Sequence, residues 1–94
     1  INAVMHQKGG LAVVHGKNVH TFPLPIAGLM SVWDGYEIAR KYAEIDEAAK
    51  ALGTNLKAPF MTLSFMALLV IPALKLSDKG LFDGNTFSFT DLQV

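Results

Sequence analysis

The sequence predicts an α+β fold: a small, mostly antiparallel β-sheet with one long amphipathic helix packed on it, plus a short N-terminal helix. Apolar residues recur at helical spacing over residues 36–52. Two runs with β-branched residues flank a turn at residues 16–18, and short strand-like runs alternate with turn residues after residue 74. A length of 94 residues predicts a single domain over residues 1–94.

Residues 1–7 are predicted to be the end of a helix, because Ile1, Val4 and Met5 share one helical face. We expect Gly9-Gly10 to stop this helix, since glycine often occupies the position after a helix C-terminus. A helix this short is marginal in water, so its first turns and its cap are expected to be missing. The chain therefore reads as a C-terminal fragment of a larger one.

A β-hairpin is predicted from strands at residues 11–15 and 19–22, with Gly16 supplying the positive φ of the turn. Pro23 and Pro25 end the second strand because proline cannot donate to a β-ladder. The segment that follows, residues 23–31 (PLPIAGLMS), is named here the apolar loop. Since loops normally lie on the surface and are polar, we expect something to cover it.

The clearest element is a helix over residues 36–52, capped by Asp34, with Glu37 placed for a capping box and Gly53 for the C-terminal stop. Its apolar face is predicted to hold Ile38, Tyr42, Ile45, Ala49 and Leu52. Three opposite-charge pairs with i,i+4 spacing are predicted on its other face: Glu37–Lys41, Arg40–Glu44 and Asp46–Lys50.

The second half of the chain is predicted to be mostly extended. Residues 60–66 alternate large apolar side chains with the small hydroxyl residues Thr62 and Ser64, which predicts a strand. Further strands are predicted at residues 74–76, 81–82 and 86–90, with turns at residues 77–80 and 83–85. Phe87 and Phe89 are expected on one face of the last strand.

Composition excludes several classes of function. Eight basic and eight acidic residues give zero net charge, which argues against nucleic acid and against an anionic membrane surface as partners. The chain has no cysteine, which excludes disulfides and thiolate zinc sites and fits a reducing, cytoplasmic location. Its longest apolar run, residues 66–72, is far shorter than the ~20 residues that span a bilayer.

An apolar content of 51% and a mean hydropathy of +0.34 are high for so small a domain. The excess favours an apolar interface with a partner, which includes self-association into a homo-oligomer; the alternative is a tight core rich in Ala and Gly.

No complete catalytic constellation is present in the sequence. His15 and His20 flank the hairpin turn, but surface histidines are commoner there than metal ligands, and no third ligand is evident. Ser31 and Ser64 lie outside any Gly-x-Ser-x-Gly elbow and are interpreted as a turn hydroxyl and a strand-face hydroxyl. The candidate acids fall at a cap, two turns and the chain end: Asp34, Asp78, Asp83 and Asp91. We therefore assign no catalytic and no metal-binding residue.

Three stretches together resemble the C-terminal domain of bacterial adenine deaminases. They are Gly9-Gly10-Leu11, the apolar loop and residues 59–68 (PFMTLSFMAL), and the likeness continues through residues 71–81. The sequence departs from the family pattern at Leu69, where a proline is expected, and at the insert of residues 32–35. The first departure puts the backbone path after Met66 in question.

The resemblance implies a parent enzyme of the amidohydrolase class that hydrolyses adenine to hypoxanthine and ammonia in purine salvage. It implies divalent metal ions (manganese, iron or zinc), held by His and Asp of a catalytic barrel, that activate the attacking water. Those ligands lie upstream, and none corresponds to a residue of this chain. The isolated chain is therefore expected to be inactive and to have a structural or site-completing role, with the rest of the parent as its partner.

Seven residues are predicted to pack against the parent or at the mouth of its active site: Ile26, Gly28, Leu29, Met30, Ser31, Thr62 and Ser64. On this hypothesis, Leu29→Asp cripples the full-length enzyme while leaving the fold of the fragment nearly intact. Two alternatives stay open from the residues alone: a free-standing interaction module that shares only the fold, and a small autonomous hydrolase using His15, His20 and a metal.

Overall fold

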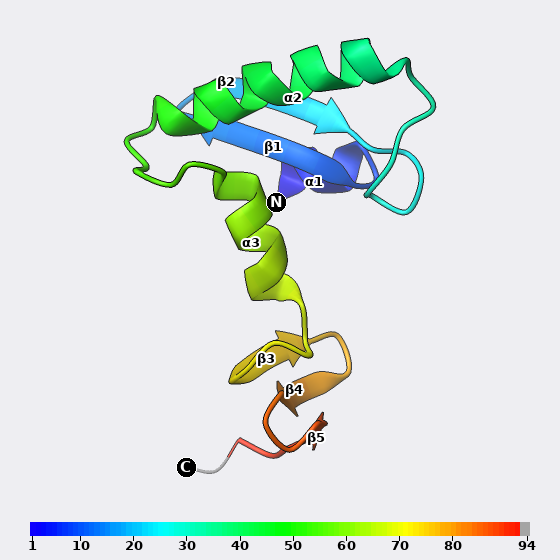
Figure 1. Ribbon diagram of the computed structural model, residues 1–94, viewed down its shortest axis with the longest axis vertical. Helices are drawn as coiled ribbons and strands as arrows, with labels where there is room; N and C mark the ends of the chain where they lie inside the picture. Colours follow the sequence, from blue (N-terminus) through cyan, green and yellow to red (C-terminus); the bar gives the residue numbers. More distant parts are fainter. Residues whose placement is uncertain (93–94) are drawn as a thin grey trace. The chain divides into compact units, whose positions relative to one another are not determined.

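The computed structural model describes residues 1–92. Within this range the chain divides into two compact units, residues 1–59 and residues 60–92. The described residues form three helices and two small antiparallel sheets, which confirms the α+β class (Figure 1). The predicted single sheet is replaced by one sheet in each unit. No helix in this part of the chain is long and apolar enough to cross a membrane.

The sheet of the first unit is the predicted hairpin, formed by β1 (Gly10–His15) and β2 (Asn18–Pro23). Its register pairs Leu11 with Phe22 and Val13 with His20. Because directly paired residues project from the same face of a sheet, these side chains share one face. Val13 and Phe22 are buried, so this face carries the core of the unit.

Helix α2 (Gly35–Lys50) lies along the hairpin and completes this core (Figure 1). Its N-cap is Asp34, as predicted, because the Asp34 carboxylate accepts a hydrogen bond of 2.9 Å from the Tyr36 N–H; the helix spans Gly35–Lys50 where residues 36–52 were predicted. Ile45 is the buried residue of the helix, and the rings of Tyr42 and Phe22 meet edge-on with centroids 6.4 Å apart. Leu52, predicted on the apolar face, is exposed beyond the end of α2.

Two of the three predicted ion pairs form along α2. Arg40 lies 2.7 Å from Glu44, and Lys50 lies 2.6 Å from Asp46. The Asp46 hydrogen bond raises the pKa of Lys50 above its ordinary value. Among the described residues the pair Glu37–Lys41 does not form. The Lys41 ammonium instead lies 5.0 Å from the centroid of the Trp33 ring, a cation–π arrangement.

Helix α1 (Asn2–His6) contacts both strands of the hairpin and lies on the other side of it from α2 (Figure 1). It ends in a Schellman motif, with Gly9 N–H donating to the Val4 carbonyl and Lys8 N–H to the Met5 carbonyl. Lys8 takes the left-handed position, with φ of 60°. The prediction that a glycine, Gly9, fills this position is therefore wrong, because the preceding residue, Lys8, occupies it.

Residues 60–66 form a helix and not the predicted strand: α3 spans Pro59–Ala67. Proline is favoured in the first turn of a helix because its missing N–H costs nothing there. The Ser64 hydroxyl donates to the Phe60 carbonyl at 2.9 Å, four residues back, so it needs no partner outside the helix. Most side chains of α3 are apolar, and four of the large ones are exposed: Met61, Leu63, Phe65 and Met66.

The second unit also holds three strands near the positions that the sequence predicts, and they pair as a separate antiparallel sheet. Its strands are β3 (Leu74–Ser77), β4 (Gly80–Asp83) and β5 (Ser88–Phe89), in that order. The strand predicted at residues 86–90 begins later, because Phe87 has a φ of 55° and belongs to the preceding turn. Phe87 and Phe89 nevertheless both meet the Phe82 ring edge-on, with centroids 5.6 and 5.4 Å away.

Candidate functional site

The apolar loop has a fixed backbone, in contrast to most surface loops. Ile26 and Met30 face each other as a β-bridge, with Ile26 N–H donating to the Met30 carbonyl at 3.0 Å. The Ile26 carbonyl accepts from Leu29 N–H at 3.0 Å and from Met30 N–H at 3.1 Å. Ala27 and Gly28 turn the chain with φ of 55° and 73°. Positive φ at both central residues is the pattern of tight type I′ turns, so the loop is a closed turn held by its own hydrogen bonds.

The side chains at the tip of this turn point to the surface. Leu29 is 77% exposed, Met30 is 58% exposed and Ile26 is also exposed. The Ser31 hydroxyl accepts a hydrogen bond of 3.3 Å from Trp33 N–H, which makes it a turn hydroxyl, as interpreted from the sequence. The tip therefore offers apolar contact area, which suits binding to another apolar surface and supplies no group for acid–base or nucleophilic chemistry.

A contact between two glycines holds the base of the loop against the start of β1. A Cβ atom placed on Gly9 would lie 2.8 Å from the Gly28 Cα, closer than real Cβ contacts allow. Leu24 N–H also donates to the Gly9 carbonyl, at 3.4 Å. Sequence reasoning assigned Gly9 to stopping a helix and missed this contact, which joins residues 19 positions apart. The conspicuous Gly9-Gly10 pair was the only signal available.

The predicted packing residues lie in both units. Ile26, Gly28, Leu29, Met30 and Ser31 belong to the first unit, and Thr62 and Ser64 to helix α3 of the second. The Ser64 hydroxyl is used within its own helix, at the Phe60 carbonyl. The expected strand that would have displayed Thr62 and Ser64 on one face does not exist, so the apolar side chains of α3 are its exposed feature instead.

His15 and His20 lie on the same face of the hairpin, since His15 pairs with Asn18 and His20 with Val13. His20 lines a hollow of about 260 Å³ between β2 and α2, together with Lys41 and Glu44. Residues 1–92 contain no group of three or more His, Cys, Asp or Glu side chains that could hold a metal ion.

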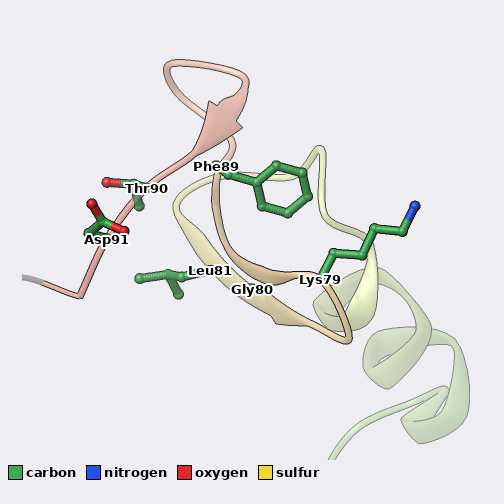
Figure 2. A pocket seen from close by; sticks show the side chains of 6 residues that line it. All are labelled: Lys79, Gly80, Leu81, Phe89, Thr90 and Asp91. Atoms are coloured by element: carbon green, nitrogen blue, oxygen red, sulfur yellow. The ribbon is translucent and has the colours of Figure 1, made fainter.

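A second hollow, of about 390 Å³, lies on the sheet of the second unit (Figure 2). Its charged side chains, Lys79 and Asp91, lie at opposite ends of the group that lines it, with Leu81 and Phe89 between them (Figure 2). A catalytic site needs polar groups that converge on one point, and these two side chains diverge.

Asp83, one of the candidate acids, is occupied by a turn. Its carboxylate accepts a hydrogen bond of 2.8 Å from Asn85 N–H. That bond, with further hydrogen bonds from Thr86, lowers the pKa of Asp83 below its ordinary value. A carboxyl held in its ionised form by turn N–H groups is suited to fixing the turn and not to donating a proton.

Comparison with known proteins identifies the family. Residues 1–88 match the family described as "Adenine deaminase C-terminal domain". The adenine deaminase of Sulfurovum sp. (strain NBC37-1) is 54% identical over 92 residues, which cover 97% of this chain and 17% of that protein. The adenine deaminase of Methanosarcina mazei is 53% identical over 98% of this chain and 17% of that protein.

The adenine deaminase of Parabacteroides distasonis is 52% identical over the whole chain and 17% of its own length. The chain thus spans about 17% of the length of these curated relatives. No solved structure matches it. On the match over residues 1–88 and these identities, the chain belongs to the adenine deaminase C-terminal domain family.

Proposed function

We propose that this chain is the C-terminal domain of an adenine deaminase, a cytoplasmic enzyme of purine salvage. In this proposal the complete polypeptide adds water to adenine and releases hypoxanthine and ammonia. The observation that carries it is the family match over residues 1–88, supported by relatives named adenine deaminase that are about half identical to nearly the whole chain. The chain itself supplies no convergent catalytic side chains.

The metal centre implied for this chemistry does not fit residues 1–92. These residues lack a cluster of three or more potential metal ligands, so neither His15 nor His20 belongs to one. A hydrolytic metal site needs at least three protein ligands around one open position. We therefore propose that the divalent metal, whether manganese, iron or zinc, is bound by the part of the enzyme outside this chain.

The role left for this domain is structural or site-completing. The apolar loop exposes Leu29 and Met30, and helix α3 exposes apolar side chains such as Leu63 and Phe65. Exposure of apolar surface to water is unfavourable in free energy, and apolar patches of this kind commonly mark an interface. The contact residues in this proposal are Ile26, Gly28, Leu29, Met30, Ser31, Thr62 and Ser64, and the partner is the remainder of the same enzyme.

The test is a deaminase assay on three proteins: the full-length enzyme, the enzyme lacking these 94 residues, and this chain alone. Each is supplied with divalent metal, and conversion of adenine to hypoxanthine is followed together with ammonia release. We expect turnover from the full-length enzyme, loss of most of it on truncation, and none from the chain alone. A full-length protein that does not deaminate adenine would favour the interaction module, and metal-dependent turnover by the chain alone would favour a site at His15 and His20.

A further inference from the structure

We infer that the apolar loop is a preformed docking element that inserts Leu29 and Met30 into an apolar pocket on the part of the polypeptide outside residues 1–94. Gly9 acts as the positioning residue of this element. The inference rests on the proposed function and deepens it, because it names the contacting segment and the way in which its shape is fixed.

The shape of the element is set before any contact is made. The hydrogen bonds between Ile26 and Met30 and between Leu29 and Ile26 close the turn, and the proline residues at 23 and 25 stiffen its entry. The close approach of Gly28 to Gly9 then fixes the turn to the start of β1. A rigid element loses little conformational entropy on docking, and this favours tight contact from a small surface.

The chemistry of the element selects an apolar partner. Residues 21–33 contain no Lys, Arg, His, Asp or Glu, so the loop and its immediate flanks offer no charged side chain to a polar surface, a phosphate backbone or a lipid headgroup. The polar side chain nearest the tip, Ser31, is already bonded to Trp33 N–H. Exposed Leu29 and Met30 side chains are thus the recognition groups.

The length of the relatives argues that the partner is the same polypeptide. This chain corresponds to only 17% of each, so more than four fifths of such an enzyme lies outside it and is joined to it covalently. Covalent linkage gives an internal surface a high effective concentration relative to any free partner. A second copy of the chain is the main competing occupant, and the experiment separates the two.

The experiment measures amide hydrogen exchange over residues 24–33 in the full-length enzyme, beside kcat/KM for adenine. Leu29→Asp is compared with Val32→Asp, a matched control, because the two side chains are 77% and 79% exposed and only Leu29 lies in the closed turn. We expect Leu29→Asp to speed exchange by about tenfold or more and to lower kcat/KM. Val32→Asp should leave both close to wild type.

A second pair of variants tests the positioning role. Gly9→Ala places a Cβ 2.8 Å from the Gly28 Cα at φ of 116°, whereas Gly53→Ala at φ of 100° meets nothing within 4 Å. Both introduce backbone strain, but only Gly9→Ala displaces the loop. We expect Gly9→Ala to raise exchange over residues 24–33 and Gly53→Ala to leave that segment protected.

Equal exchange and equal kcat/KM in Leu29→Asp and Val32→Asp would overturn the inference, as would rapid exchange of the segment in the wild-type enzyme. Protection that appears only at high protein concentration, with an oligomer that Leu29→Asp dissociates, would assign the loop to a second copy and also overturn it. Absence of adenine turnover in the wild type would instead count against the proposed function, while the exchange data still report whether the loop is covered.

Discussion

Replacement of Phe22 by alanine should remove a large part of the stability of the first unit. Phe22 is 2% exposed, and its ring lies 6.4 Å from the rings of both Trp33 and Tyr42. The other buried apolar side chains of this unit, Ile45 and Val13, are slightly more exposed, at 3% and 7%. The ring therefore links the hairpin, helix α2 and the segment that leads into the helix, and nothing nearby can replace it.

The size of the effect follows from this burial. Truncation of a buried phenylalanine to alanine costs about 3–5 kcal/mol, because the lost transfer free energy adds to that of the cavity. A unit of 59 residues, Ile1–Pro59, has a free energy of unfolding of about 3–9 kcal/mol at the usual stability per residue. Phe22→Ala therefore removes between a third and all of that stability.

The assay is urea denaturation of the 94-residue chain followed by tryptophan fluorescence. Trp33 is the only tryptophan in the sequence and contacts Phe22, so its emission reports the first unit. With an m-value of about 1 kcal/mol/M for so small a unit, the midpoint should fall by about 3 M or the transition should vanish. Tyr36→Ala, at a ring that is 91% exposed, is the control and should change the free energy of unfolding by less than about 0.5 kcal/mol. A loss below about 1 kcal/mol in Phe22→Ala would refute the proposed core.

Two further predictions concern local hydrogen bonds. Asp34→Ala removes the acceptor for Tyr36 N–H and should lower the free energy of unfolding by about 1 kcal/mol in the same urea assay, whereas Asp34→Asn, an equally good cap, should not; equal losses would argue that the cap is unimportant. Asp83 has a pKa lowered by Asn85 N–H, so its stabilisation is present above its ordinary pKa of 3.8 and is lost as the pH falls through the folded-state value. Asp83→Asn should therefore flatten the acid limb of thermal stability below pH 4, as measured by circular dichroism, and an unchanged limb would contradict this assignment.

The sequence predicted well those elements whose local signals agree with their packing. The hairpin was found because Gly16 and the flanking valines specify both the turn and the strands. Helix α2 was found because its cap, charge pairs and apolar face all indicate the same residues. In both cases local propensity and tertiary contacts favour one structure, which is the condition for prediction from sequence alone.

Helix α3 was not predicted, because the alternation of apolar and hydroxyl side chains over residues 61–65 is compatible with a strand as well as with an apolar helix. An apolar helix has no polar face to mark its period, so Thr62 and Ser64 were interpreted as the outer side of a strand. The hydrogen bond from Ser64 to Phe60 shows why a hydroxyl is compatible with the helix. The residues around Phe87 likewise carry no local sequence signal for the left-handed backbone that Phe87 adopts.

The sequence identified the residues of the candidate site but did not predict their backbone conformation. The apolar loop stood out because it lacks the polar residues of an ordinary loop, and Ser31 was correctly interpreted as a turn hydroxyl. Its closure between Ile26 and Met30 depends on Ala27 adopting a positive φ, which few alanines do. The contact of Gly9 with Gly28 depends on the whole hairpin being in place, so no local pattern could reveal it.

The connectivity of the two sheets bears on how the chain acquires its structure during synthesis. Each strand in the described residues pairs only with its neighbours in sequence: β1 with β2, β3 with β4, and β4 with β5. Such short-range pairing closes only short loops and is associated with rapid folding. Since the first unit contains its own hairpin and helix, we expect it to fold on the ribosome before residues 60–92 have emerged.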